Sequence, residues 1–401
     1  MKVLTINTAP YGSVARIAIE TAELAEKHNI EVRLSFGYSS HPIESKYVYY
    51  HTGNFLSSVI DMILSRMTGL MGTFSFLYTL MYLRKIKKYN PDIIHLHNLH
   101  GCMNLGLIMD YIKKYKKPVI WTFHDCWALT GHCVHFDYVQ CMKWKSNCHH
   151  CPIYRSFPEA YIDNSRYMHK KKKQWFSNLE KAILVAPSYW MSEQIKESYL
   201  SNYPIKVIQN GINLSTFKIS KSNFKQKYKI NTKFILLGVA FGWGPKKGLD
   251  TFIRLANDLI DEFQVVLVGT NKESEKCLPS NIISIHATQN QAELAEIYNG
   301  ADLFVNLTRE DTFPTVNIEA LACGTPVITY RTGGSPEIID ETCGCVVEKD
   351  NYNSLIKKIR EIKEKKPYNA NDCRRRAEQF DKNDRFMDYI KLYKKIYEDT
   401  K

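Results

Sequence analysis

Short hydrophobic runs alternate along the chain with longer segments in which hydrophobic positions recur every three or four residues. In the first half, the hydrophobic runs predict strands at residues 3–7, 31–36, 92–96, 118–123 and 182–186. In the second half, they predict strands at 234–240, 263–269, 281–286, 302–306 and 326–329. The helical spacing predicts helices at 13–28, 249–260, 291–299, 315–322 and 352–363. Strands separated by helices indicate α/β folding with parallel sheets, because parallel neighbours need crossover connections.

This rhythm occurs twice, which predicts two doubly wound, Rossmann-like domains in 401 residues. The first unit ends near Val207-Ile-Gln-Asn-Gly-Ile212, and a lysine-rich segment leads into the second. We therefore predict an N-terminal domain (1–210), a C-terminal domain (211–371) and a C-terminal helix (372–401) that packs back on the N-terminal domain. Doubly wound sheets bind ligands beyond the carboxyl ends of their strands, so a cleft between two such domains is the expected site.

Charge is the one unusual feature of the composition. Lys and Arg number 54 against 41 Asp and Glu, which gives a formal net charge of +13. The hydrophobic fraction of 44% excludes a wholly disordered chain. The positive excess suggests an anionic partner: nucleic acid, a phosphate-bearing small molecule or a membrane surface. The N-terminus lacks the pattern of a signal peptide, so we expect a cytoplasmic protein with reduced thiols.

The segment 67–83 is the least polar part of the chain and lies uncharged between Arg66 and Arg84. Its seventeen residues include two glycines and are at the lower limit for crossing a bilayer. A surface-lying or buried helix is the better interpretation. Clustered cations at 84–88 fit a peripheral helix on the anionic inner face of the cell membrane. A core helix with a solvated basic end explains the pattern equally well.

Two loops that follow strands have the composition of phosphate-binding loops. Gly12 and Ser13 come directly after the first strand, where Gly12 permits close backbone approach and Ser13 can cap the next helix. Lys246 and Lys247 follow the first strand of the second half and could neutralise a diphosphate. A plain turn and two solvated lysines are the respective alternatives.

The segment 308–320 carries the strongest chemical signal. Glu310 and Asp311 lie in the loop after a predicted strand, and Glu319 lies in the first turns of the helix that Thr315 and Val316 open. Carboxylates there can accept hydrogen bonds from sugar or ribose hydroxyls, and a helix N-terminus can bind phosphate. The segment 332–337 closes over the same place. An acidic helix cap is the alternative interpretation.

Asp311-x7-Glu319, followed by Ala-Leu-Ala-Cys-Gly-Thr-Pro-Val, resembles the carboxylate motif of retaining GT-B glycosyltransferases of family 4, where Glu-x7-Glu is usual. The segments 93–100, 207–212 and 332–337 are similar to that family too. The run 123–133 and the cysteines after it resemble the capsule and colanic-acid subgroup most. The resemblance implies a GT-B fold, with the two Rossmann-like domains facing a cleft. It also implies transfer of a hexose from a UDP- or GDP-linked sugar to a glycan or lipid-linked saccharide, with retention.

The resemblance implies roles for residues of the C-terminal half. Glu319 would hold the nucleotide ribose, and Asp311 by register or Glu310 by identity would contact the donor sugar. The donor site would also include Phe313 and the backbone N–H groups near Thr315 and Val316.

The resemblance also implies roles around the reaction centre. Gly12 and Ser13 would lie beside the diphosphate, Lys247 would stabilise the leaving diphosphate, and His124 would line the reaction centre as a positioning group. The family commonly has an Arg at the register of Gly242, for which Lys246 would substitute. The implied reaction is a front-side displacement in which the diphosphate assists deprotonation of the acceptor. Cationic side chains would do the work of a metal, so no cofactor is expected for catalysis.

Four cysteines lie close together in a loop at 126–152. Cys133, Cys141, Cys148 and Cys151 have the spacing C-x7-C-x6-C-x2-C, and four thiolates can bind a structural Zn²⁺. Disulfides or redox-labile pairs and free thiols are the alternatives. A closed four-cysteine site leaves no open position, so catalytic zinc is not expected.

Two other classes of protein compete with a glycosyltransferase. A zinc-containing nucleic-acid-binding protein would explain the charge and the cysteines, but none of its usual motifs is present. A nucleotide-sugar epimerase of GT-B fold would act without an acceptor. The favoured interpretation has no nucleic-acid partner.

Overall fold

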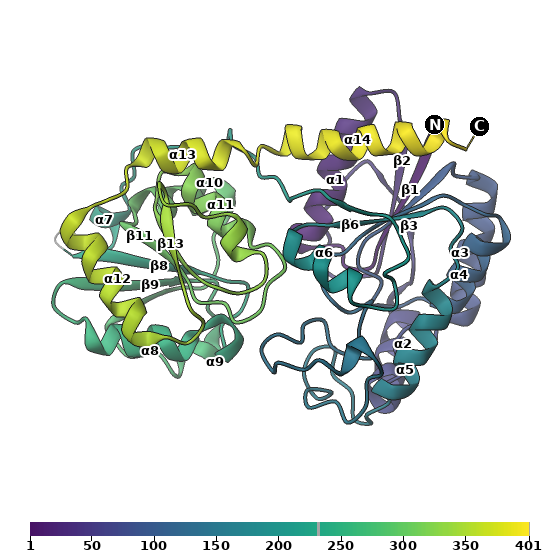
Figure 1. The fold of residues 1–401 in the computed structure, drawn as a ribbon, viewed down its shortest axis with the longest axis horizontal. Helices are drawn as coiled ribbons and strands as arrows, with labels where there is room; N and C mark the ends of the chain where they lie inside the picture. The colour runs from purple at the N-terminus through teal and green to yellow at the C-terminus, as the bar shows by residue number, and fades with distance from the viewer. Residues whose placement is uncertain (231–232, 401) are drawn as a thin grey trace. The chain divides into compact units, whose positions relative to one another are not determined.

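The hydrophobic runs of the first half form a seven-stranded sheet in a computed structural model that describes residues 1–230 and 233–400 (Figure 1). The strand order is β3-β2-β1-β4-β5-β6-β7, and every neighbouring pair is parallel. β1 and β4 are neighbours at the point where the winding of the sheet reverses, which is where doubly wound folds bind ligands. The strands are β1 (Lys2–Asn7), β2 (Glu31–Phe36), β3 (Val48–His51), β4 (Ile93–Leu96), β5 (Val119–Thr122), β6 (Ala182–Ala186) and β7 (Ile205–Val207).

The second half forms a separate parallel sheet of six strands in the order β10-β9-β8-β11-β12-β13. Its winding reverses between β8 and β11. The two sheets confirm the predicted fold class of two doubly wound, Rossmann-like domains. The strands are β8 (Phe234–Val239), β9 (Phe263–Val268), β10 (Ile282–Ile285), β11 (Leu303–Asn306), β12 (Val327–Tyr330) and β13 (Gly344–Val347).

Alternating strand residues bury opposite faces of the first sheet. Val3 packs with α1 and α14 on one face, where Figure 1 shows the two helices side by side, whereas Leu4 faces the core of the other. The helices of this unit are α1 (Gly12–Lys27), α2 (Phe55–Thr68), α3 (Phe76–Tyr89), α4 (Leu105–Lys114), α5 (Ser165–Phe176), α6 (Tyr189–Lys196) and α14 (Lys382–Glu398), with a short 3₁₀ turn at Lys143–Lys145.

The second sheet is covered in the same way. α8 and α12 enclose one core, and α7, α10, α11 and α13 enclose the other. The helices are α7 (Phe224–Lys227), α8 (Leu249–Asp258), α9 (Lys272–Glu275), α10 (Gln291–Gly300), α11 (Thr315–Ala322), α12 (Tyr352–Lys365) and α13 (Ala370–Glu378), with 3₁₀ turns η2 (Pro245–Lys247) and η3 (Ser335–Glu337).

The structure divides into two compact units, 1–209 with 385–401, and 210–384. The predicted C-terminal helix at 372–401, whose last residue lies outside the described residues, is two helices in the structure. α13 packs against α11 in the second unit, and α14 carries Phe386 and Tyr393 into the core of the first. The helix breaks because the backbone at Phe380 and Lys382 bonds to both polar groups of Ile212 (3.0 Å each). Phe380 accordingly belongs to the second core.

The apolar segment 67–83 is not one helix either. α2 ends at Thr68, where Gly69 takes a left-handed conformation (φ +69°), and α3 begins only at Phe76. Within the part of the chain that the structure describes, no helix has the length and apolar character needed to cross a bilayer.

Candidate active site

Lys246 and Lys247 lie at the carboxyl end of β8, in the turn that leads into α8. Gly248 closes this turn with φ +75°, and a Cβ there would lie 2.6 Å from the Cβ of Leu307. The backbone N–H of Arg309 donates to the carbonyl of Lys246 at 2.8 Å. Glycine therefore lets the lysine turn pack directly on the loop that follows β11.

Each lysine is paired with a carboxylate of that neighbouring loop. Lys246 Nζ lies 2.6 Å from Glu310 Oε1, and Lys247 Nζ lies 3.1 Å from Asp311 Oδ2. Lys247 also donates to the hydroxyl of Thr308 at 3.2 Å. The structure thus brings together four predicted site residues from two loops, with 64 positions between the members of each pair. The pairs hold both ammonium groups in fixed positions at one end of the sheet.

Arg309 anchors the loop after β11 that carries Glu310 and Asp311, here called the carboxylate loop. Arg309 was not predicted from the sequence as a site residue. Its guanidinium makes a two-pronged bond to Asp250 (2.7 and 2.8 Å) and donates from Nε to Asp350 (2.7 Å). The hydrogen bonds to Asp250 raise the pKa of Arg309 above its ordinary value. A buried cation between two acids fixes the backbone beside Glu310 and Asp311.

The loop after β12 closes on the same backbone. Gly333 has φ +51°, and a Cβ at this position would overlap the carbonyl oxygen of Asp311. The predicted convergence of the 308–320 and 332–337 segments therefore rests on direct backbone contact, which only glycine permits.

Several buried polar atoms around this loop have no hydrogen-bond partner among the described residues. They are Glu310 Oε2, Asn317 Nδ2, Thr332 Oγ1 and Ser335 Oγ. Buried polar groups in native proteins are nearly always paired. Both acceptors and donors occur in this set, so a polyhydroxylated ligand such as a sugar could pair with it.

α11 begins at Thr315, and neither Thr315 nor Val316 is fully buried. Pro314 occupies the N-cap position without a side-chain cap, which leaves the first N–H groups of the helix to other partners. Glu319, further along α11, accepts a hydrogen bond from the hydroxyl of Tyr298 at 3.2 Å. Phe313 lies in the core with its ring centroid 5.9 Å from that of Phe380. Because its ring is buried, Phe313 can contact a donor only through its backbone.

In the first unit, Gly12 and Ser13 are exposed in the first turn of α1, at the carboxyl end of β1. Gly12 has φ +77°, and nothing lies within 4 Å of the position where a Cβ would be. The prediction that Ser13 caps the helix is wrong. The helix begins one residue earlier, Tyr11 occupies the N-cap position, and no side chain caps this end.

His124 belongs to a row of neighbouring aromatic rings, here called the histidine column, that begins on α14. Its Nε2 lies 2.8 Å from Nδ1 of His97, and the two rings are parallel within 9°. The ring of His95 lies 4.1 Å from that of His97, centroid to centroid, at an angle of 36°, and Nδ1 of His95 lies 2.6 Å from the hydroxyl of Tyr393. Burial lowers the pKa of His124 to about 4 and that of His95 to about 3. The column is therefore neutral near pH 7, which suits a positioning role for His124.

A second pair of residues beside His124 was also missed. His100 Nε2 lies 2.8 Å from Asp125 Oδ2, and the N–H of Trp127 donates to Oδ1 of the same carboxylate at 2.9 Å. Burial opposes ionisation of Asp125, but these partners hold its pKa below the ordinary value. The repeated histidines of the 95–100 segment were the signal in the sequence that could have pointed to these contacts.

The buried histidines predict that acid lowers the stability of the folded protein. Burial holds the pKa of His97 well below 6.5, so the unfolded chain binds this proton more readily than the folded chain. Stability should therefore fall as the pH drops below about 6.5, by up to about 2 kcal/mol at pH 5 for each such histidine. Urea unfolding at pH 7 and pH 5 measures this loss.

The variant His97→Asn should lose less stability between these two pH values than the unchanged protein. His41→Asn, at an exposed position, is the control and should behave like the unchanged protein. An identical loss in all three proteins would contradict a neutral, buried His97.

Buried polar contacts support the cysteine loop. All four cysteines are free thiols, and the described residues contain no group of three or more His, Cys, Asp or Glu placed to share a metal ion. Burial raises the pKa of Cys133 to about 12 and that of Cys148 to about 11. Lys172 is fully buried and donates to the carbonyls of Trp127 (2.7 Å) and Thr130 (3.1 Å). The zinc ligand set of Cys133, Cys141, Cys148 and Cys151 stays a prediction.

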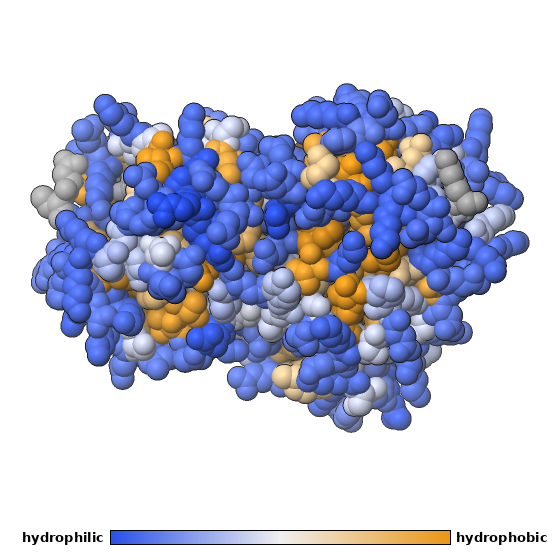
Figure 2. All heavy atoms as spheres, turned by 45° about the horizontal axis from the view of Figure 1, so that its top comes forward, coloured by the Kyte–Doolittle hydropathy of each residue, from blue (hydrophilic) through white to orange (hydrophobic). Residues whose placement is uncertain are grey.

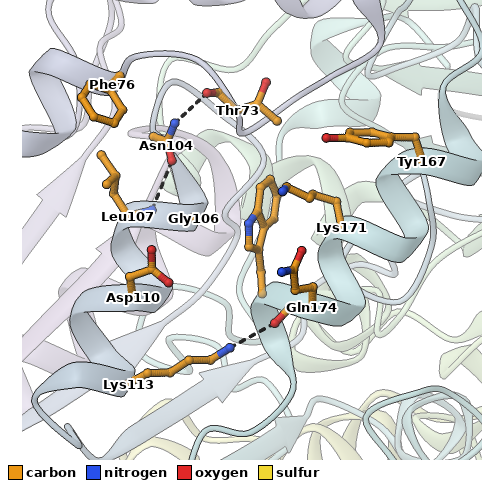
Figure 3. Close-up of a pocket in the computed structure, with 11 residues that line it drawn as sticks. Thr73, Phe76, Asn104, Gly106, Leu107, Asp110, Lys113, Tyr167, Lys171 and Gln174 are labelled. Atoms are coloured by element: carbon orange, nitrogen blue, oxygen red, sulfur yellow. Dashed lines mark hydrogen bonds between the residues drawn. The ribbon is translucent and has the colours of Figure 1, made fainter.

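A pocket of about 420 Å³ lies elsewhere in the first unit, between α4, α5 and the start of α3 (Figure 3). Its lining includes Phe76, Asp110, Lys171 and Trp175, and Lys113 donates across it to the carbonyl of Gln174 (3.0 Å). None of the predicted site residues lines this pocket.

Two parallel α/β domains, each with candidate residues at the carboxyl ends of its strands, define the chain as a GT-B-type protein. Its sequence matches the description "Glycosyltransferase Family 4" over residues 14–216 and "Glycosyl transferases group 1" over residues 220–380. The chain belongs to glycosyltransferase family 4, which confirms the resemblance seen in the sequence. This membership favours a transferase over a nucleic-acid-binding protein or an epimerase.

Known proteins similar to the chain support this class. WcaC of Escherichia coli K12, provisionally assigned as a colanic acid biosynthesis glycosyl transferase, is 24% identical over 86% of each chain. The N,N'-diacetylbacillosaminyl-diphospho-undecaprenol alpha-1,3-N-acetylgalactosaminyltransferase of Campylobacter jejuni is 27% identical over 51% of this chain and 58% of its own. The crystal structure of Anabaena HepE with UDP and glucose has a TM-score of 0.68 and 15% identity over 98% of this chain and 100% of its own. At that identity, HepE supports the fold alone.

Proposed function

We propose that the chain transfers a hexose from a nucleoside-diphosphate sugar to a saccharide acceptor, with retention of anomeric configuration. The observation that carries the proposal is the pairing of Lys246 with Glu310 and of Lys247 with Asp311 at the carboxyl ends of β8 and β11. Fixed cations suit a diphosphate, and adjacent carboxylates suit sugar hydroxyls.

The donor is proposed to bind mainly through the second unit. Glu319 would accept hydrogen bonds from the ribose, with the hydroxyl of Tyr298 holding its carboxylate. The unpaired Oε2 of Glu310 would accept from a hydroxyl of the donor sugar. The N–H groups that begin α11 would meet the phosphates. A UDP-linked donor, of the kind whose nucleotide is bound in the HepE structure, and a GDP-linked donor are the two alternatives that the experiment below separates.

In the proposed reaction, the bond from the anomeric carbon to the diphosphate oxygen breaks as the acceptor oxygen bonds to the same face of that carbon. The acceptor proton passes to the departing diphosphate oxygen, so atoms and charge balance without an oxidant or reductant. Lys247 would stabilise the charge that develops on the diphosphate. No metal is needed in this scheme. His124, held by His97, would orient the reacting groups beside Gly12 and Ser13.

The acceptor is proposed to be a lipid-linked saccharide of a surface polysaccharide. WcaC is assigned to colanic acid synthesis, and the name of the Campylobacter protein specifies a diphospho-undecaprenol acceptor. Both relatives therefore act, by their names, in the assembly of surface or lipid-linked glycans.

Thermal unfolding with UDP, GDP and their sugars tests the donor. One nucleotide series should raise the unfolding temperature, because a ligand that binds only the folded state stabilises it. Calorimetry on Glu319→Ala should then show donor binding weaker by about 1–3 kcal/mol, since a charged hydrogen bond is lost. Glu341→Ala, at an exposed site in the same unit, is the control. Absence of any shift with every nucleotide would overturn the proposal.

A further inference from the structure

The outer surface of α2 and α3 is apolar to a degree that the rest of the fold does not explain. Hydrophilic residues cover most of the face drawn in Figure 2, with several groups of hydrophobic residues between them. On α2 and α3 many large hydrophobic side chains are exposed, among them Leu56 (64%) and Leu77 (74%), and a hydrogen bond from Ser75 to Asp61 (2.6 Å) joins the start of α3 to the middle of α2. The full set, here called the α2–α3 apolar face, is Phe55, Leu56, Ile60, Met62, Ile63, Met67, Phe76, Leu77 and Met81.

The amphipathic helix α2 has its polar face inside and its apolar face outside, the opposite of a helix that packs on a globular core. Its fully buried residues are Asp61 and Ser65, and no side chain of α2 belongs to a hydrophobic core of the described residues. Residues four apart share one helix face, so the polar stripe Ser57-Asp61-Ser65 faces inward and the apolar stripe faces outward. A helix arranged this way has its apolar partner outside the chain.

Specific polar contacts hold α2 in this orientation. Asp61 accepts hydrogen bonds from Ser75 (2.6 Å) and Ser65 (3.2 Å), and Asn164 donates to the carbonyl of Thr68 (2.6 Å). Asn54 caps the helix by bonding to Ser57 in both directions. These contacts fix the rotation of α2 about its axis, so the exposure of its apolar stripe is built into the fold.

The charge around the α2–α3 apolar face is mainly positive, with Glu159 paired to Arg66 (3.5 Å) as an acidic neighbour. Between Phe55 and Tyr89 the sequence has five basic residues, and its one acidic residue, Asp61, is buried. The basic residues Arg66, Arg84, Lys85, Lys87 and Lys88 are all exposed. Figure 3 shows that the pocket beside Phe76 adds two cations, Lys113 and Lys171, and one acid, Asp110, at this border. Positive charge beside exposed apolar residues is complementary to a lipid surface, which has anionic headgroups outside and hydrocarbon within.

We propose that the α2–α3 apolar face docks on an anionic phospholipid bilayer. The apolar side chains would enter the interfacial region, and the cations at the end of α3 would lie among the lipid phosphates. Tyr161 and Ile162 are exposed beside the end of α2, where the N–H of Tyr161 donates to the carbonyl of Arg66 (2.7 Å), and would extend the same contact. The inference does not depend on the proposed transfer reaction, because it concerns residues outside the candidate site.

Vesicle sedimentation tests the proposal without any donor or acceptor. The full-length protein should bind vesicles that contain phosphatidylglycerol, and bind them at least tenfold more tightly than vesicles of phosphatidylcholine alone. Leu56→Ser/Ile60→Ser/Ile63→Ser should weaken binding at least tenfold. Lys85→Ala/Lys88→Ala should weaken binding and reduce its dependence on salt. Ile219→Ser/Ile260→Ser removes exposed hydrophobic residues of the second unit and should bind vesicles normally.

Circular dichroism and thermal unfolding should show that the variants remain folded, since the substituted side chains are exposed. Vesicle binding that is absent, or that is unchanged in the triple variant, would overturn the proposal. Sedimentation velocity tests whether a second copy of the chain, and not a membrane, covers this face. A dimer of the unchanged protein that the triple variant abolishes would show that a second copy covers the face, and would also overturn it.

Discussion

Replacing Lys247 with alanine is expected to lower the rate of sugar transfer by about 10²–10³-fold. Lys247 is the predicted partner of the leaving diphosphate, and its ammonium is already held by Asp311 (3.1 Å) and Thr308 (3.2 Å). A fixed charge of this kind costs no reorganisation when the diphosphate departs, and removal of one such group in an enzyme has effects of this size. The loss should appear mainly in kcat, because the charge on the leaving group grows in the transition state.

Initial rates with saturating donor measure this effect once the thermal-shift panel has identified the nucleotide. Lys276→Ala removes an exposed lysine of the same unit and should leave the rate unchanged. Lys246→Ala provides a finer comparison, because Lys246 is paired with Glu310 at 2.6 Å and should affect donor binding more than kcat. A Lys247→Ala enzyme with normal kcat would assign the leaving-group role to another residue.

The sequence was sufficient to predict the parallel sheets, because every central strand is a hydrophobic run followed by a helical pattern. The missed strands are β3, β7 and β13. All three are edge strands of three or four residues, and β3 alternates half-buried and exposed residues. Short edge strands have one neighbour and little to bury, so they leave a weak hydrophobic signal.

The sequence predicted the loops of the candidate site but not the contacts between their residues. The lysine loop and the carboxylate loop were both identified, since each follows a strand whose carboxyl end faces the expected site. The pairing of Lys246 with Glu310, and the anchoring of Arg309 by Asp250, depend on the neighbouring positions of β8 and β11 in the sheet. Contacts between residues about 60 positions apart leave no local pattern that a single sequence could reveal.

The outward orientation of the apolar stripe of α2 was missed for a different physical reason. Sequence patterns assume that the apolar stripe of a helix faces the core, whereas the apolar stripe of α2 faces outward. The apolar composition of 67–83 predicted one helix, but the helix break at Gly69 divides that segment. His95 and Tyr393 illustrate the limit set by long-range contacts, because their hydrogen bond forms only when α14 returns to the first unit.

Replacing Gly333 with alanine is expected to destabilise the protein and abolish donor binding, whereas Gly242→Ala should be mild. Both glycines have positive φ, +51° and +84°, so both alanine variants carry the cost of a left-handed backbone, about 1 kcal/mol. Only at Gly333 would the new Cβ overlap the carbonyl oxygen of Asp311, whereas nothing lies within 4 Å of the Cβ position at Gly242. The difference between the variants therefore isolates the contact between the two loops.

The overlap at Gly333 involves backbone on both sides, so no side-chain rotation can relieve it. Either the loop after β12 or the carboxylate loop must move, and the second movement displaces Asp311 from Lys247. Chemical denaturation should show Gly333→Ala less stable than Gly242→Ala by about 1–3 kcal/mol, the usual range for overpacking. Calorimetry should show a much larger loss of nucleotide binding for the same variant. Equal stability and equal binding in the two variants would mean that the loops do not meet as the structure places them.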